Sequence, residues 1–413
     1  MTLNRANPLL LALVLACLAL SSATAVDLPV LPDKISPSRS NARAAARQEQ
    51  HEAIGYLQSA GAKIEREKGE KGESFLVMTW PGGNQGLENL RQLRELRWLD
   101  LGLSTITDDG LIHVGKLANL EILKLQQTRV TDAGVASLRE LKHLRGLSLH
   151  DTRISGRGLE PLESLAELQY LNLSWTRCGD AGLAHVASLK QLEQLYLFDA
   201  QVTDAGIPHL LQLKNLRGLH LTWNDVGDAG AGQLRNLPQL EELWLSFTRI
   251  GNDTLVRLRG MPNLTVLYVG DSQVTEAGLA YLGTLPRLQV LDLTNLPITD
   301  AGLVKLRGCQ NLAGLTLDGC DIQGGGLAHL AALPQLQYLN LRGTPVTDGA
   351  LVLLAKLPAL TELNLSETEI SDAGVRQILK CKRLKELNLL GTRVTDAGAA
   401  ELQRLAPRLT IHR

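Results

Sequence analysis

Residues 120–143, LEILKLQQTRVTDAGVASLRELKH, form a 24-residue unit that recurs along most of the chain. The opening pattern L-x-x-L-x-L begins at Leu96 and returns at this same interval up to Leu384, thirteen times in all, without insertion or deletion. Of the 39 apolar positions in these patterns, 38 are leucine and the exception is Val269. A fixed period of this length is typical of repeat architectures, so the sequence predicts a solenoid.

Each unit has a physical reading of its own. Residues 120–125 alternate in the manner of a short strand, with leucines on one face and variable residues on the other. Thr128 can hydrogen-bond the backbone where the chain turns. The motif at Thr131–Gly134 predicts a helix start, because Thr is a good N-cap and Asp in the first turn complements the helix dipole. Apolar residues spaced along 135–141 then form one helical face, so a unit is a strand followed by a short helix.

The intact motif T-D-A-G returns at Thr203, Thr299 and Thr395. On these residues the chain resembles the leucine-rich repeat family, in the exported bacterial type with 24-residue T-D-A-G-L repeats, and more distantly the leucine-rich part of F-box receptors. The resemblance runs from Phe75 to the C-terminus. It implies an α/β fold: a curved solenoid with a parallel β-sheet on the concave face and short helices on the convex face. Members of the family mostly bind protein or glycan partners and are rarely catalytic.

The segment 1–25 is expected to be a signal peptide. Arg5 precedes an apolar run over 8–20, and Ser22-Ala23-Thr24-Ala25 provides a small-x-small cleavage pattern. A run of this length rises about 20 Å as a helix, less than the ~30 Å hydrocarbon core, so a retained anchor is disfavoured. A lipoprotein attached through Cys17 is a minor alternative. We therefore expect an exported protein, periplasmic or extracellular, with no membrane span after cleavage.

The remaining boundaries follow from the repeat. We expect a flexible leader over 26–39, an N-terminal cap over 40–94, the solenoid over 95–407, and a terminal strand over 408–413. The cap is predicted to contain an alanine-rich helix, a hairpin and a degenerate repeat. In that repeat Phe75 and Val77, one repeat length before Leu99 and Leu101, take the strand positions of these leucines.

Composition excludes several functions. With 42 Lys+Arg against 43 Asp+Glu, there is no basic excess for nucleic acid. The cysteines at 178, 309, 320 and 381 fall on core-like positions and are expected to be buried thiols. Four histidines share one position on the outer helices (His113, His185, His209 and His329), and no metal-binding or catalytic motif is present. The sequence therefore predicts no catalytic residue, no metal and no cofactor.

One group of residues does not follow from the fold. Of the 14 aromatic residues, 8 fall between 170 and 268 on positions that should point outward from the sheet. An aromatic patch with polar neighbours is what a binding hot spot needs. The predicted ligand-binding residues are Tyr170, Trp175, Tyr196, Phe198, Asp199, His220, Trp223, Trp244, Phe247 and Tyr268.

Several interpretations of this patch stay open. The main hypothesis is a monomeric scaffold that binds a protein partner, and the alternative is a polysaccharide-binding module in which tryptophans stack on sugars beside Asp199, Asp225 and Asp271. A spacer without a ligand is also possible, as are aromatic residues that merely shield the sheet. An enzyme would need His220 paired with Asp199 or Asp225. A row of arginines beside the patch could grip carboxylates or simply be a solvated edge (Arg129, Arg153, Arg177 and Arg249).

Overall fold

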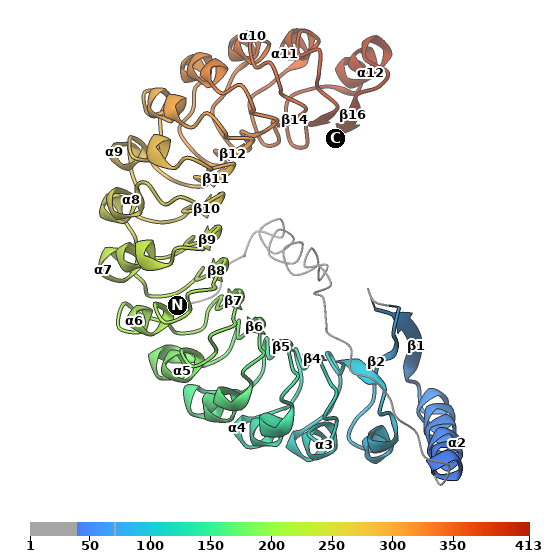
Figure 1. Cartoon of the computed structure of the whole chain (residues 1–413). Helices are drawn as coiled ribbons and strands as arrows, with labels where there is room; N and C mark the ends of the chain where they lie inside the picture. The colour runs from blue at the N-terminus through green and yellow to red at the C-terminus, as the bar shows by residue number, and fades with distance from the viewer. Residues whose placement is uncertain (1–38, 70–71) are drawn as a thin grey trace.

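The computed structural model of the protein describes residues 39–69 and 72–413. The signal peptide, the alternative anchor at Cys17 and all but the last residue of the predicted leader lie outside these residues. In the described part of the chain, sixteen strands form one sheet in sequential order, and the chain curves into an open horseshoe (Figure 1). The strands line the concave face and the helices the convex face. The predicted leucine-rich solenoid is confirmed.

The strands are short and regularly spaced. They are β1 (Lys63–Lys68), β2 (Ser74–Thr79), β3 (Leu96–Asp100), β4 (Ile122–Lys124), β5 (Gly146–Ser148), β6 (Tyr170–Asn172), β7 (Gln194–Tyr196), β8 (Gly218–His220), β9 (Glu242–Trp244), β10 (Val266–Tyr268), β11 (Val290–Asp292), β12 (Gly314–Thr316), β13 (Tyr338–Asn340), β14 (Glu362–Asn364), β15 (Glu386–Asn388) and β16 (Thr410–His412). β1 pairs with β2 antiparallel, and every later pair is parallel.

The helices include both α-helical and 3-10 segments. The α-helices are α2 (Arg39–Ser59), α3 (Asp108–Val114), α4 (Asp132–Val135), α5 (Gly179–Val186), α6 (Ile207–Leu210), α7 (Asp228–Ala231), α8 (Asn252–Leu258), α9 (Glu276–Leu279), α10 (Leu351–Leu354), α11 (Asp372–Ile378) and α12 (Asp396–Leu405). The 3-10 helices are η1 (Leu87–Gln92), η2 (Ala136–Glu140), η3 (Gly156–Ser164), η4 (Gly232–Asn236), η5 (Leu282–Thr284), η6 (Gly302–Gly308), η7 (Gly325–Ala332) and η8 (Asp348–Ala350).

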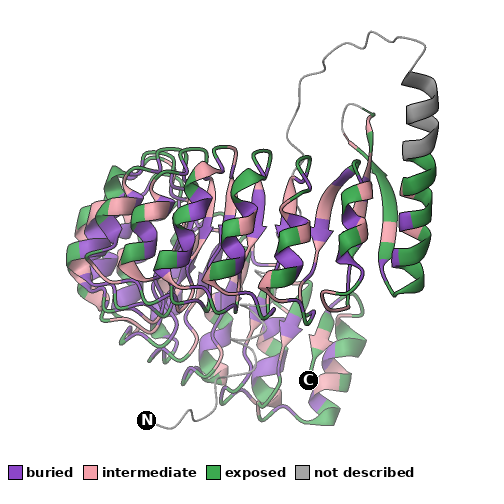
Figure 2. Cartoon of the chain, turned by 90° about the horizontal axis from the view of Figure 1, so that it is seen from below, coloured by how far each residue is buried: buried purple, intermediate pink, exposed green. Residues whose placement is uncertain are grey.

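The curvature follows from the sizes of the elements. Neighbouring strands lie about 4.8 Å apart, whereas a helix with its side chains is about 10 Å wide, so the helical side needs more length. The leucines of successive repeats stack in register, as Leu123 does against Leu147, and both are fully buried. Buried residues accordingly fill the space between sheet and helices, while exposed residues cover the outer helical surface and α2 (Figure 2).

The hydroxyl residue that follows most of the strands closes the turn as expected. The Thr128 hydroxyl donates to the Leu125 carbonyl at 2.8 Å, and Thr176 does the same to Leu173 at 2.6 Å. Both threonines are buried, so this bond satisfies a polar group that has left water.

The Asp of the T-D-A-G motif has a second role that the sequence did not predict. Its carboxylate reaches across to the next repeat, where Asp132 accepts from the Ser155 amide at 2.6 Å and Asp180 from the Thr203 amide at 2.8 Å. The aspartate also lies in the first turn of its own helix, as expected. The aspartate links one repeat to the next by charge-assisted hydrogen bonds.

This contact also explains the irregular sequence at 251–254. Gly251 has no hydroxyl to offer Asp228, and Thr254 donates its hydroxyl to the same carboxylate instead. Asn252 takes the place of the usual Asp, accepting from the Thr275 amide at 3.0 Å and donating to the Thr275 hydroxyl at 2.9 Å. The motif has changed, but the link between repeats is kept.

The degenerate N-terminal repeat differs from the prediction in its strand. Leu76 and Met78 face the core, whereas Phe75 and Val77 are only half-buried. A register irregularity between Leu76 and Val77 places Met78 opposite Leu99, so the alternation is shifted by one residue. The extrapolated assignment of Phe75 and Val77 to the leucine positions was therefore wrong, because a strict repeat spacing does not account for a bulge.

Candidate functional site: two aromatic ladders on the concave sheet

The first aromatic group, which we call the strand ladder, runs across five neighbouring strands. It consists of rings in β6 to β10 (Tyr170, Tyr196, His220, Trp244 and Tyr268). Adjacent ring centroids lie 5.2, 4.2, 4.7 and 3.9 Å apart in this order, and the ring planes of Trp244 and Tyr268 are almost parallel, at 3°. The parallel register brings them together, since Tyr196, His220, Trp244 and Tyr268 occupy the same position in successive repeats.

The second group, the turn ladder, lies where the chain leaves the sheet. It consists of Trp175, Phe198, Trp223 and Phe247, with centroids 5.5, 6.4 and 4.8 Å apart. Asp199 occupies, in its own repeat, the turn position that Trp175 and Trp223 occupy in theirs. The structure thus brings together the predicted site residues in two rows that run across the same strands.

The turn ladder carries unusual backbone geometry. Trp175, Trp223 and Phe247 have φ values of 58°, 62° and 56°, in the left-handed region. The same turn position is left-handed in every regular repeat, and elsewhere it holds mostly Gly, Asp or Asn (Asp151, Asp199, Asp271, Asn295, Gly319, Gly343 and Gly391). Left-handed backbone costs an ordinary side chain about 1–2 kcal/mol. The fold therefore disfavours large aromatic residues where three of the ladder's rings are attached.

This geometry separates the two interpretations of the aromatic residues. Shielding by residues that favour strands suits the strand ladder, whose tyrosines and tryptophan are half-buried within strands. It does not suit Trp175 and Trp223, which lie in turns and are each 46% exposed. Strand propensity therefore gives no reason for the two most exposed aromatic side chains of the patch.

The patch is less exposed than the sequence suggested. Only Trp175 and Trp223 are exposed, and the other six aromatic side chains are half-buried against one another. His220 is buried, with 8% of its surface exposed, because Tyr196 and Trp244 stack on its two faces. A pattern of outward positions could not reveal this mutual covering, which depends on ring contacts between repeats.

The pair needed for an enzyme is not formed. Burial lowers the pKa of the His220 imidazole to about 3, so the ring is neutral and a very weak base. Asp225 forms an ion pair with Arg249, on the rim, and burial raises the pKa of Asp199. Within residues 72–413 the His220 Nε2 atom is buried without a hydrogen-bond partner. This arrangement positions no general base.

The other features noted in the sequence are the cysteines and the row of arginines. Cys178, Cys309 and Cys320 are buried free thiols, and burial raises the pKa of each to about 12. Cys381 is only half-buried, so the prediction for that residue was partly wrong. The described residues contain no group of three or more His, Cys, Asp or Glu that could hold a metal ion. All four arginines of the predicted row have exposed side chains (Arg129, Arg153, Arg177 and Arg249).

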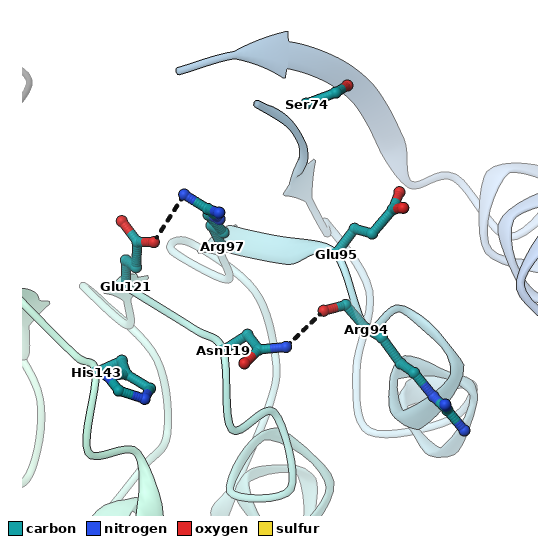
Figure 3. A pocket seen from close by; sticks show the side chains of 7 residues that line it. All are labelled: Ser74, Arg94, Glu95, Arg97, Asn119, Glu121 and His143. Atoms are coloured by element: carbon teal, nitrogen blue, oxygen red, sulfur yellow. Dashed lines mark hydrogen bonds and ion pairs between the residues drawn. The ribbon is translucent and has the colours of Figure 1, made fainter. Parts of the chain in front are cut away.

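A polar cavity of about 290 Å³ lies elsewhere, near the starts of β3 and β4 (Figure 3). Arg97 is already paired, with Glu121 of the cavity lining at 3.2 Å and with Glu73 outside the lining at 3.4 Å. The Arg94 side chain points away from the other residues drawn. The cavity is lined by Ser74, Arg94, Glu95, Arg97, Asn119, Glu121 and His143. It therefore offers a partner few unpaired charged groups.

Sequence reasoning missed two acidic residues next to the patch. Asp292 in β11 is paired with Tyr268 on the neighbouring strand β10. Asp318 comes just after the next strand, β12. Burial raises the pKa of Asp292 to about 6 and also raises that of Asp318. Comparing equivalent positions between repeats could have found Asp292, because Asn172 and Asn340 hold the same position elsewhere.

Comparison with known proteins agrees with the fold. A leucine-rich repeat protein of Leptospira interrogans is 22% identical, with a TM-score of 0.54, covering 79% of this chain and 80% of that one. An internalin of Listeria monocytogenes is 19% identical, with a TM-score of 0.50, covering 88% and 93%. The mouse RP105/MD-1 complex matches at 18% identity and a TM-score of 0.54, covering 81% and 69%. At these identities the likeness shows a shared fold.

Sequence comparison identifies the family. No curated protein matches the chain. A family model described as leucine-rich repeat region matches residues 81–302, and one described as leucine rich repeat matches residues 356–379. The first match alone covers more than half of the 413 residues. Together with the horseshoe of parallel strands, this shows that the chain belongs to the leucine-rich repeat family.

Proposed function

We propose that this protein is a non-catalytic, exported scaffold that binds a protein partner through the ten-residue aromatic patch on its concave face. The observation that carries the proposal is the turn ladder. Trp175 and Trp223 are exposed, and both occupy a left-handed turn that disfavours large side chains. Exposed aromatic side chains retained against a conformational cost are best explained by contact with a partner.

The ring contacts favour a protein over a polysaccharide. Sugar binding by stacking needs an open ring face, but Trp244 is stacked between His220 and Tyr268. Trp223 likewise has Phe247 on one side, at 4.8 Å. The ring faces of Trp244 are therefore covered, and the exposed Trp175 and Trp223 each stack on a phenylalanine ring as well. Partly covered aromatic rings of this kind suit the apolar side chains of a polypeptide. Solenoids of this kind commonly present extended concave binding surfaces.

Export rests on the apolar N-terminal segment and its cleavage pattern, which lie outside the described residues. No helix in residues 39–69 or 72–413 is both long and apolar enough to cross a membrane. The RP105/MD-1 structure is a complex of two proteins, which supports a protein partner for a chain with this fold. Attachment of residues 1–25 to a reporter enzyme that is active only after export would test this part: reporter activity supports it, and reporter retained in the cytosol contradicts it.

Binding is tested with a variant that removes three of the four rings of the turn ladder without straining the backbone. Trp175→Asn, Trp223→Asn and Phe247→Asn place at each turn a residue that tolerates left-handed geometry. The matched control carries Leu103→Asn and Gln127→Asn, at the same turn position outside the patch. All three proteins are immobilised and exposed to envelope extract, and retained proteins are identified by mass spectrometry.

The proposal is supported if a protein is retained by the wild type and by the control but not by the patch variant. Equal retention by all three overturns the assignment of the site. If polysaccharide rather than protein is retained selectively, the alternative function is correct. Circular dichroism and melting curves establish that the patch variant is folded, so that loss of binding is not loss of structure.

A further inference from the structure

Both aromatic ladders end on carboxylates at the same side of the patch. Asp271 follows Phe247 at the turn position of the next repeat, and Asp292 follows Tyr268 in strand register. Asp318 comes next, after β12. We call these three residues the acidic trio. The chain as a whole is almost neutral, with 42 basic and 43 acidic residues, so this concentration of negative charge is a local feature.

The trio is poorly neutralised by the protein itself. Within residues 72–413, no Lys or Arg forms an ion pair with Asp271 or Asp292. Asp271 accepts from Asn295 Nδ2 at 3.0 Å, and Asp292 accepts from the amide and hydroxyl of Thr294. Burial, together with the charge of neighbouring acids, raises the pKa of Asp271 and Asp292.

Asp318 has a basic neighbour that is already shared. Arg342 approaches Asp318 at 3.3 Å and Glu367 at 2.6 Å, so one guanidinium serves two carboxylates. At neutral pH the trio therefore retains an excess of negative charge beside an apolar patch. Such an arrangement attracts a cation brought by a ligand.

The fold does not need a carboxylate at position 292. Asn172, Asn340, Asn364 and Asn388 hold the equivalent position, and Asn172 Oδ1 accepts from the Ser174 amide at 2.9 Å. That bond is the counterpart of the one from Thr294 to Asp292. A neutral amide would thus close the same turn. Asp292 is only 8% exposed, so its negative charge is costly to bury, and the fold gives no reason for this cost.

A second observation places unsatisfied polar atoms within the patch. His220 and Thr222 are 8% and 7% exposed, and in the described part of the chain His220 Nε2 and Thr222 Oγ1 have no hydrogen-bond partner. Both belong to the stretch that crosses the middle of the patch, at and just after β8. Buried polar atoms of this kind normally find a partner, and a bound polypeptide can provide one.

From these features we infer that the partner is a polypeptide segment with an apolar anchor and a lysine or arginine beside it, the anchor contacting the aromatic patch and the basic side chain contacting Asp271, Asp292 and Asp318. This inference rests on the proposed function and adds the chemistry of the partner. A long basic side chain matches carboxylates that lie in three successive repeats, at or just after the strand. The described residues offer no cluster suited to a metal ion instead.

The test uses a phage-displayed library of random 12-residue peptides, selected separately on four proteins. These are the wild type, the patch variant (Trp175→Asn, Trp223→Asn, Phe247→Asn), a trio variant (Asp271→Asn, Asp292→Asn, Asp318→Asn) and a charge control. The control removes the same number of charges from exposed convex positions, through Asp109→Asn, Glu140→Gln and Asp253→Asn. Asparagine keeps the shape and the acceptor oxygen of each aspartate.

The wild type and the charge control should enrich peptides in which Lys or Arg adjoins an apolar residue. A peptide chosen in this way should bind the trio variant at least about tenfold more weakly, as expected for loss of close charge pairs. If wild-type peptides carry no more Lys and Arg than the unselected library, or bind the trio variant equally well, the inference is wrong while the patch proposal stands. If the patch variant selects the same peptides as the wild type, or the wild type enriches none, both proposals fail.

Discussion

The carboxylate of Asp108 contacts the next repeat, where Oδ1 accepts from the Thr131 amide at 2.7 Å and Oδ2 from the Thr131 hydroxyl at 2.6 Å. It fills the space that a Cβ on Gly134 would need. The Asp of one T-D-A-G motif and the Gly of the next therefore belong to a single contact. Where Gly324 replaces the Asp, the glycine position of the following repeat is Ala350, whose Cβ occupies the vacated space.

This contact predicts that Gly134→Ala is destabilising. The added methyl group would displace the Asp108 carboxylate from Thr131, and overpacking of this kind costs about 1–3 kcal/mol. Gly349→Ala is the matched control, because nothing lies within 4 Å of a Cβ there. Urea denaturation should show a lower midpoint for Gly134→Ala and an unchanged or higher one for Gly349→Ala. Equal midpoints would show that the carboxylate moves aside freely.

The left-handed turn position predicts that Leu103→Asn is stabilising. Leu103 has φ of 60° and is 76% exposed, so its replacement loses little packing. Because Asn tolerates this geometry and Leu does not, the unfolding free energy should rise by about 1 kcal/mol. Leu103→Val should lower it, since β-branched residues fit the left-handed region worst. Thermal melting of the two variants measures both effects, and a lower melting temperature for Leu103→Asn would contradict the assigned strain.

His220 predicts a loss of stability in acid. Its pKa is about 3 in the folded chain against 6.5 for an ordinary histidine, so the unfolded state binds a proton that the folded state does not. Stability from this group therefore falls as pH drops below about 6.5, by about 2 kcal/mol between pH 7 and pH 5. His220→Phe keeps an aromatic ring in the strand ladder and removes the titratable group.

The free energy of unfolding of His220→Phe, measured relative to that of the wild type, should therefore increase from pH 7 to pH 5. Denaturation midpoints at the two pH values give this difference. A constant difference would mean that the imidazole is not desolvated as the ring contacts indicate.

Asp292 predicts the opposite dependence on pH. Its folded pKa of about 6 lies above the ordinary 3.8, so the folded state holds the proton more tightly and stability falls as pH rises from about 4 to 6. Asp292→Asn should raise the unfolding free energy by about 2–3 kcal/mol at pH 7 and by less than about 1 kcal/mol at pH 4. An equal gain at both pH values would point to packing rather than charge.

The position of the candidate site could be predicted from the sequence, but its detailed geometry could not. The repeat period places Tyr196, Trp244 and Tyr268 at one position of successive repeats, and the structure stacks them as neighbours. The same period does not reveal that His220 is enclosed between two rings, nor that Trp175 is attached to left-handed backbone. Both depend on how side chains from different repeats fill space together.

The amino-acid sequence by itself determined the repeat, the strand and helix of each unit and the row of buried leucines, because hydrophobic periodicity is a local property of the chain. Only the tertiary structure decided which repeats share a hydrogen bond, as Asp108 and Thr131 do, and which carboxylates meet at the end of the patch. The hydrogen bond between Asp108 and Thr131, for example, joins residues that are 23 positions apart in the sequence. The energies of these contacts depend on burial, and burial exists only once neighbouring repeats have stacked.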